Sequence, residues 1–333
     1  MTRPRIAVLP TAKLQADLFP ADVFEELRLV GDLVRNETDK ALEPDEIAKM
    51  LAGCDAAITS WGVKKLDARA LRGAKSLRAV AHAAGTVKGV TSDDLWSLGV
   101  KVTSGAMVIA IDVAEAALGM LIVGMKNAFR ISRALAKGGW TGDHGEGTAR
   151  CLGRKKIGII SASHVGRQMM RLLRSFDAQV LLYDPFVKAE RAREFGARKV
   201  ELDELLRESH AISVHAPSIP ATDKMLNAAA FALMRDDCVI VNTARGSIID
   251  EPALIKELKK GRFFACIDVT EPEPPADDSP LRTLPNVVLT PHIAGGNDNR
   301  WRLGLHAAQE LGRFFRGEKM LGEVTREMLA TMA

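Results

Sequence analysis

The sequence predicts an α/β protein built from two doubly wound parallel-sheet domains. Its 333 residues are enough for two domains with separate hydrophobic cores. From Lys156 onward, near-continuous apolar runs recur at regular spacing and are separated by helical patterns. Apolar runs without a period-two alternation are typical of parallel strands that are covered by helices on both faces of a sheet. Together, the length and this pattern favour two α/β domains.

The first third of the chain shows the same alternation of short apolar runs and helical patterns, which indicates an α/β domain. Its strand-like runs are 5–10, 56–60, 77–85 and 100–105. This third has no closing segment of its own, so we expect the C-terminal tail to return and complete it. The predicted N-terminal domain is therefore discontinuous and comprises residues 1–105 plus 297–333.

Residues 111–136 contain no proline, and the pattern predicts one long helix there. Its most apolar part, 113–125, is too short to span a bilayer and contains Glu115, so we expect a buried helix and no membrane contact. Residues 137–153 are rich in glycine and polar side chains, which is typical of a connector.

The second predicted domain, 106–296, contains six strand-like runs and the helical patterns between them. The runs are 157–161, 179–184, 211–217, 238–244, 264–269 and 287–291. The helical patterns lie at 165–176, 203–209, 227–234 and 252–260, and a last helix is expected from about Asn297 to Phe315. Six strands at this spacing indicate a nucleotide-binding Rossmann domain.

The composition, with 47% hydrophobic and 26% charged residues, is that of a soluble globular protein. The net charge of +4 comes without a long basic run, so we expect no nucleic-acid partner. The four cysteines and seven histidines show no metal-type spacing, which favours reduced thiols and predicts no metal site. The first residues run almost directly into a strand, so we expect no signal peptide and a cytoplasmic protein.

Three polar side chains follow strand-like runs of the second domain: Arg245, Glu273 and His292. In an open parallel sheet, ligands bind outside the carboxyl ends of the strands. A cation, a carboxylate and an imidazole at that edge have the chemistry of a catalytic set. Taken singly, the residues could instead be a surface ion pair, a loop acid and a core histidine.

The first strand of this domain runs into a damaged dinucleotide fingerprint. Ser161, Ser163 and Gly166 occupy the three positions of the G-x-G-x-x-G pattern. The Ser163 hydroxyl could donate to a phosphate, and the backbone amides of His164 and Val165 could bind it at the helix N-terminus. The alternative is a strand–turn–helix that binds nothing.

Asp184 ends the next strand, where a carboxylate would accept the adenosine ribose hydroxyls and repel a 2′-phosphate. No arginine follows it, since Pro185 and Phe186 come next. NAD(H) is therefore favoured over NADP(H). The alternative role of Asp184 is that of a strand-end cap before a proline turn.

Long motifs resemble those of the D-isomer-specific 2-hydroxyacid dehydrogenases. The resemblance covers nearly the whole chain and is strongest in 113–122, 241–262 and 268–296. It implies two Rossmann-like domains with a cleft between them and NAD(H)-dependent interconversion of a small 2-oxoacid and a D-2-hydroxyacid. It also implies a homodimer joined through the nucleotide domains, with helix 111–136 as a candidate interface.

The resemblance assigns a role to each catalytic residue. His292 would act as the general acid and base. The family's glutamate, which would hold the imidazole, falls on Glu273 rather than Glu271, because Glu273 is the one five residues after Asp268. Arg245 would bind the substrate carboxylate and keto oxygen. Backbone amides near Ala84 and Gly85 would hold the other carboxylate oxygen.

The predicted cofactor-binding residues comprise four in the fingerprint loop, two at the end of the next strand, and six that the resemblance places around the nicotinamide. They are Ser163, His164, Val165, Gly166, Asp184, Pro185, His215, Pro217, Thr243, Ala244, Asp268 and Gly295. The chain departs from the family pattern at several points, with His164 in place of an arginine and Lys88 in the substrate loop. Because of the serine-substituted loop, an alternative function is a catalytically weak or inactive NAD(H)-binding sensor or interaction protein on the same fold.

Overall fold

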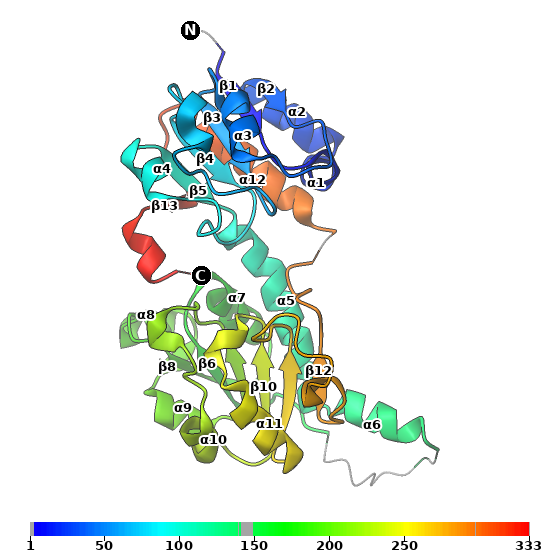
Figure 1. The fold of residues 1–333 in the computed structure, drawn as a ribbon. Coiled ribbons are helices and arrows are strands. Elements are labelled where there is room, and N and C mark those ends of the chain that lie inside the picture. Colours follow the sequence, from blue (N-terminus) through cyan, green and yellow to red (C-terminus); the bar gives the residue numbers. More distant parts are fainter. Residues whose placement is uncertain (1–2, 139, 141–148, 297, 333) are drawn as a thin grey trace. The chain divides into compact units, whose positions relative to one another are not determined.

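The computed structural model describes residues 3–138, 140, 149–296 and 298–332. The chain forms two compact units (Figure 1). The first unit comprises residues 1–109 and 296–333, and the second comprises residues 110–295. Most of the predicted connector, at 139 and 141–148, lies outside the described residues.

The first unit contains a six-stranded sheet in the order β13-β5-β4-β3-β1-β2. Its parallel strands are β1 (Arg5–Val8), β2 (Asp32–Arg35), β3 (Ala56–Thr59), β4 (Ala79–His82) and β5 (Lys101–Ser104). Its helices are α1 (Ala12–Leu18), α2 (Ala21–Val30), α3 (Pro44–Leu51), α4 (Asp93–Ser97) and α12 (Arg300–Phe315). The edge strand β2 escaped sequence analysis because its four residues, DLVR, are only partly buried.

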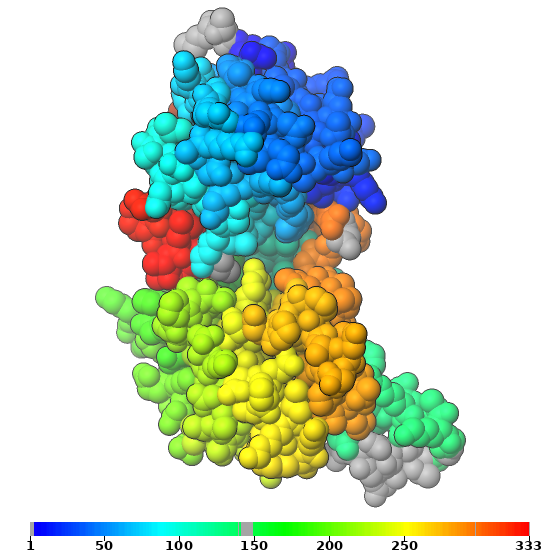
Figure 2. Space-filling model, in the orientation of Figure 1, coloured from blue at the N-terminus to red at the C-terminus, as the bar shows by residue number. Residues whose placement is uncertain are grey.

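The C-terminal tail completes this first unit, as predicted. Strand β13 (Glu323–Val324) pairs antiparallel with β5, and α12 packs against α2 and β4. The fully buried carboxylate of Glu310 accepts hydrogen bonds from the Thr103 hydroxyl at 3.0 Å and the Gly322 amide at 2.8 Å. The orange α12 accordingly lies among the blue elements in Figure 1, and the red tail packs beside the cyan residues in Figure 2. The helix begins at Arg300, three residues later than predicted.

The second unit contains a seven-stranded, fully parallel sheet in the order β12-β11-β10-β9-β6-β7-β8. The strands are β6 (Lys156–Ile160), β7 (Gln179–Tyr183), β8 (Ala197–Lys199), β9 (Ala211–Val214), β10 (Cys238–Asn242), β11 (Phe263–Ile267) and β12 (Val287–Leu289). The prediction of six strands missed β8, whose sequence Ala-Arg-Lys is too polar and short to stand out. The order reverses at β6, as in a dinucleotide-binding fold, so the predicted fold class is confirmed.

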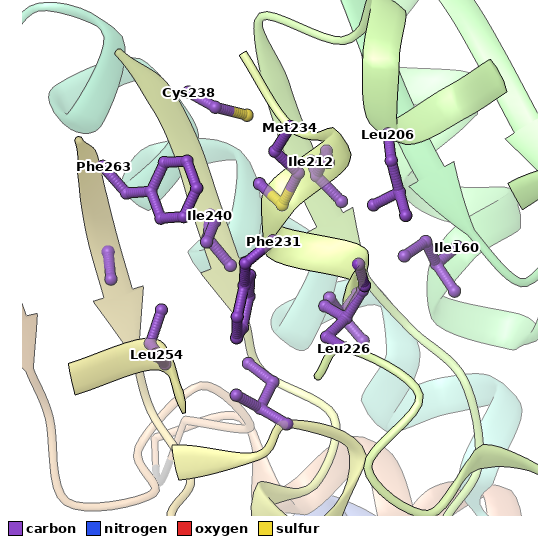
Figure 3. Close-up of a cluster of buried hydrophobic side chains, with 14 of the residues drawn as sticks. Ile160, Leu206, Ile212, Leu226, Phe231, Met234, Cys238, Ile240, Leu254 and Phe263 are labelled. Carbon is purple, nitrogen blue, oxygen red and sulfur yellow. The ribbon is translucent and has the colours of Figure 1, made fainter. Parts of the chain in front are cut away.

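Helices cover both faces of this second sheet and create two hydrophobic cores. The helices after β6 are α7 (His164–Leu173), α8 (Ala189–Glu194), α9 (Leu202–Glu208), α10 (Ala228–Leu233) and α11 (Glu251–Lys259). In one core, the fully buried Phe231 of α10 meets Phe263 of β11 with ring centroids 5.9 Å apart (Figure 3). These strands are apolar in sequence because both of their faces are buried.

The single helix predicted for 111–136 is wrong. The structure contains α5 (Ala106–Met125) and α6 (Ala128–Leu135), separated at Asn127. Asn127 adopts φ 55°, a left-handed conformation that asparagine tolerates better than most residues and that ends the helical path.

The prediction that the apolar helix is buried holds for one face only. Ala114, Ala117 and Leu121 lie in the second unit's core, but only 28% of the most apolar window of α5 is buried. With 20 residues and a hydropathy of 2.2, α5 is long and apolar enough to cross a membrane by those two criteria alone. Core helices of soluble proteins meet the same criteria.

The strand ends of the second sheet are aligned. Ile160 pairs with Val214, Val214 with Asn242, Asn242 with Ile267 and Ile267 with Leu289. Five neighbouring strands therefore finish at one level, and the residues that follow them emerge along a single edge. This register determines which side chains can act together.

We predict that Gly304→Ala lowers the free energy of unfolding by about 1–3 kcal/mol, because overpacking forces the backbone apart. A β-carbon at Gly304 would lie 1.8 Å from the Leu18 carbonyl oxygen, where α12 crosses the end of α1. Gly312→Ala in the same helix is the control, since its nearest neighbour is the flexible end of Arg316 at 3.1 Å. Urea unfolding measures both variants. Equal stability of the two would mean that α12 does not approach Leu18 this closely.

Candidate active site

Arg245, Glu273 and His292 leave the aligned ends of β10, β11 and β12, the last three strands of the second sheet. The Nδ1 atom of His292 lies 2.7 Å from Oε1 of Glu273. Because an ionised carboxylate can only accept, this geometry places the hydrogen on Nδ1 and leaves Nε2 free for chemistry. The carboxylate that contacts the imidazole is that of Glu273, five residues after Asp268, and the pair is about half exposed (46% and 44%).

Arg245 is held in a tight turn after β10. The buried side chain of Asn242 accepts from the Ala244 amide at 3.0 Å and donates to the Arg245 carbonyl at 2.9 Å. A β-carbon at Gly246 would lie 2.1 Å from the Thr270 backbone, so the glycine lets this turn pack against the loop that leads to Glu273.

The guanidinium of Arg245 is partly desolvated. Burial lowers the pKa of Arg245, and the nearby negative charge of Glu273 opposes that shift. A guanidinium stays charged in either environment, so Arg245 presents a partly dehydrated fork of donors. Such a fork matches the two oxygens of a carboxylate or of a 2-oxoacid.

The loop after β6 keeps the fingerprint geometry despite its serines. Ser161 takes φ 77°, the left-handed conformation that glycine normally supplies here, at a cost of roughly 1–2 kcal/mol for a residue with a β-carbon. Ser163 caps α7, and its hydroxyl accepts from the Gly166 amide at 3.3 Å. A β-carbon at Gly166 would lie 2.0 Å from the Ser161 carbonyl oxygen, so only glycine fits there.

This arrangement leaves two backbone amides at the start of α7 that could bind an anion. The first-turn amides of His164 and Val165 have no carbonyl within the helix to which they could donate. The residue is exposed as a whole, but loss of water around its ring, and then the positive charge of Arg167, lower the pKa of His164. The Ser163 hydroxyl already accepts a capping hydrogen bond from the Gly166 amide. Its own hydrogen is not used in that bond, so the hydroxyl can still donate to a phosphate, as predicted from the sequence.

Asp184 closes the loop from the next strand. Its carboxylate is only 7% exposed and accepts from the amides of Ala162 and Phe186, both at 2.8 Å. The strand-end cap that sequence analysis left open as an alternative is therefore present, and acceptor capacity remains for a ribose hydroxyl. Pro185 follows directly, and the Phe186 side chain is 76% exposed.

Two buried polar groups beside this loop lack a partner within the described residues. Both ring nitrogens of His215, at the end of β9, and the hydroxyl of Thr243, at the end of β10, make no hydrogen bond there. Burial lowers the pKa of His215 to about 3, so its ring is neutral with one donor and one acceptor. Unsatisfied buried groups cost about 1–3 kcal/mol each, and a bound cofactor with amide and hydroxyl groups would satisfy them.

Asp268 is buried, and its carboxylate is bonded to other groups of the protein. It is 1% exposed, and its carboxylate accepts hydrogen bonds from Thr290, Ile293 and Ala294. A carboxylate has about four acceptor positions, so one remains for a cofactor amide. The other predicted cofactor residues, Pro217, Ala244 and Gly295, follow β9, β10 and β12 at the same edge.

The predicted substrate loop lies in the first unit, after β4. The Ala84 carbonyl accepts from the Gly105 amide at 2.9 Å, and the Gly85 carbonyl accepts from the Ser104 hydroxyl at 2.6 Å. These bonds fix the loop through its carbonyls. Within the described residues there is no group of three or more histidine, cysteine, aspartate or glutamate side chains that could hold a metal ion.

Sequence reasoning missed Asn242 and Thr290, whose side chains hold Arg245 and the His292 loop. Asn242 could have been found, because an asparagine at a strand end before a turn is a known signal for a side-chain-to-backbone bond. Thr290 gave no such signal, because its partner Asp268 is 22 residues away.

Comparison with known proteins matches residues 118–294 to the family "D-isomer specific 2-hydroxyacid dehydrogenase, NAD binding domain". A D-3-phosphoglycerate dehydrogenase of Archaeoglobus fulgidus is 32% identical over 76% of this chain and 48% of its own length. A hydroxypyruvate reductase of Thermotoga maritima is 31% identical over 82% and 89%. The chain thus spans about half the length of the first relative and most of the second.

Among solved structures, the apo form of D-lactate dehydrogenase from Escherichia coli is similar at a TM-score of 0.73. It is 27% identical, over 96% of this chain and all of that chain (100%). The likeness extends over both units, including the first, which the family model does not reach.

We predict that NADH binding weakens by roughly five-fold as pH rises from about 5.5 to 8, the scale of one exposed ion pair. In the protein without cofactor, the pKa of His164 is lowered. A bound cofactor phosphate would raise that pKa by favouring the charged imidazole, so cofactor binding would take up a proton and be tighter at low pH. Fluorescence titration of wild type and His164→Gln measures this. If the glutamine variant keeps the same pH dependence, His164 does not lie beside the phosphate.

Proposed function

Because the chain belongs to the D-isomer specific 2-hydroxyacid dehydrogenase family, we propose that it is an NAD(H)-dependent oxidoreductase that interconverts a 2-oxoacid and a D-2-hydroxyacid. The family predicted from the sequence motifs is thereby confirmed. The observation that carries the proposed activity is the imidazole–carboxylate pair of His292 and Glu273, at 2.7 Å, with the partly desolvated Arg245 close enough for Glu273 to affect its pKa.

The chemistry assigned to the residues follows from that geometry. Arg245 binds the substrate carboxylate and keto oxygen through its fork of donors. With Nδ1–H bonded to Glu273, the doubly protonated ring of His292 donates the Nε2 proton to the keto oxygen during reduction, and the Nδ1–H form accepts a proton at Nε2 during oxidation. Its half-exposed ring can exchange that proton with solvent. Bound NADH supplies the hydride that the carbonyl carbon receives.

Several residues would hold the cofactor. The amides at the start of α7 would bind the pyrophosphate, and Asp184 would accept the adenosine ribose hydroxyls. His215 and Thr243 would gain partners from the nicotinamide end, and Asp268 has one acceptor position for its amide. The buried carboxylate of Asp184 would repel a 2′-phosphate, which supports NAD(H) over NADP(H).

The substrate is proposed to be a small 2-oxoacid such as glyoxylate or hydroxypyruvate. The fork of Arg245 suits the substrate's carboxylate and keto group, and the resemblance assigns a second carboxylate oxygen to backbone amides at Ala84 and Gly85. The sequence shows no cluster of basic residues that would select a phosphorylated substrate.

The test is NADH consumption with a panel of 2-oxoacids, run from glyoxylate to bulkier acids and with NADPH in parallel. We expect turnover with NADH, and a kcat/KM at least about ten-fold lower with NADPH.

His292→Ala should lower kcat by about a hundred-fold or more while NADH still binds. His210→Ala is the matched control, because His210 precedes β9 at the opposite end of the sheet. Wild-type turnover by His292→Ala would refute the assignment.

A second candidate, an NAD(H)-binding sensor or interaction protein, is favoured by the strained Ser161 and the capping bond of Ser163. The same assay separates the two. NADH binding without turnover across the panel would support the sensor.

We also propose a homodimer that covers the exposed apolar surface of α5 and α6. Ile111 on α5 is 37% exposed and Phe129 on α6 is 42% exposed, and α6 has no buried residue. In Figure 2, α6 projects from the rest of the second unit. Light scattering should give twice the chain mass of 36.1 kDa, and Phe129→Asp should shift it toward the monomer. A monomeric wild type at micromolar concentration would contradict the proposal.

A further inference from the structure

The loop that carries His292 is fastened by one buried residue. Asp268 accepts four hydrogen bonds from it. The Thr290 hydroxyl donates to Oδ1 at 2.5 Å, the Ile293 amide to Oδ1 at 2.9 Å and the Ala294 amide to Oδ2 at 2.9 Å. The His292 amide donates to the Asp268 carbonyl at 2.9 Å. We call these four bonds the Asp268 clasp.

We propose that Thr290 is a positioning residue that, through the Asp268 clasp, aims the His292 imidazole at Glu273. This inference rests on the proposed function of His292 in catalysis. Thr290 supplies the only side-chain donor of the clasp, since the other three donors are backbone amides that a substitution leaves in place. Pro291 has no amide hydrogen, so the Thr290 hydroxyl secures the loop on the N-terminal side of His292.

The His292 side chain is only weakly packed, so the orientation of its imidazole depends on the conformation of the His292 backbone. The side chains of His292 and Glu273 are 46% and 44% exposed. His292 has φ 53°, a left-handed conformation that a residue with a β-carbon leaves readily unless its neighbours hold it. The clasp fixes residues on both sides of it. With that backbone fixed, Nδ1 lies 2.7 Å from Glu273.

Thr290 could instead act only on stability, because it also follows the short edge strand β12. Its amide donates to the Ile267 carbonyl at 3.0 Å, a bond that any non-proline residue can make. The two roles separate when the hydroxyl alone is removed. Thr290→Val keeps the shape without the hydroxyl, Thr290→Ser keeps the hydroxyl, and Thr283→Val is a control at an exposed threonine that precedes β12.

The first test requires no turnover. Long-range proton–nitrogen NMR spectra of the histidine rings report which ring nitrogen carries the hydrogen, and His292→Ala identifies the His292 signals. We expect the Nδ1–H tautomer in wild type, Thr290→Ser and Thr283→Val, and a shift toward the Nε2–H tautomer in Thr290→Val. A wild-type tautomer pattern in Thr290→Val overturns the proposal.

The second test uses the oxoacid assay. Thr290→Val should lower kcat by about ten-fold or more, as expected for a misplaced catalytic group, with the Kd for NADH changed less than about two-fold. Thr290→Ser should restore most of the activity. In a Glu273→Gln background, Thr290→Val should cost less than about two-fold further, because both changes disturb one unit.

Equal losses in both backgrounds, or a fall in unfolding temperature that accounts for the lost activity, would show a structural role only and overturn the proposal. The two tests also separate this inference from the proposed function. If wild type shows the expected tautomer but turns over no oxoacid, the positioning of His292 stands and the proposed function fails.

Discussion

The alignment of five parallel strand ends is the constraint on which the rest of the second unit depends. The register runs unbroken from Ile160 to Leu289 across β6, β9, β10, β11 and β12. Alternate side chains of each strand pack in the two cores on opposite faces of the sheet, so a shift of one residue in any strand would exchange the side chains between the cores. Residues as far apart in sequence as Ser161 and His292 thereby emerge along one edge.

What that edge does depends on a few short-range contacts. Asn242 shapes the turn at Arg245, Asp184 closes the loop after β6, and Asp268 fastens the loop at His292. Each is a buried side chain that bonds to backbone atoms, which sets loop geometry with little dependence on neighbouring side chains. The same contacts explain how the fingerprint loop tolerates serine. Ser161 keeps the left-handed turn, and Gly166 remains where the backbone approach leaves no room for a β-carbon.

Much of this could be predicted from the sequence, because apolar strands buried on both faces and polar residues at their ends are local signals. That pattern predicted most strands of the second unit's sheet, the loop after β6 and the return of the C-terminal tail. The break at Asn127 was not, since a left-handed residue within an apolar stretch leaves no periodic signal. The polar strand β8 was missed for a related reason. Thr290 escaped because its partner Asp268 is remote in sequence and their bond exists only in the fold.

The central claim is that one aligned edge presents Arg245 and His292 to a 2-oxoacid. A crystal structure with NADH and an unreactive 2-oxoacid analogue such as oxamate tests it most directly. We expect the analogue's carboxylate to lie within hydrogen-bond distance of the Arg245 guanidinium and its keto-type oxygen to lie about 3 Å from Nε2 of His292. An analogue bound elsewhere, or with its keto-type oxygen turned away from Nε2, would contradict it.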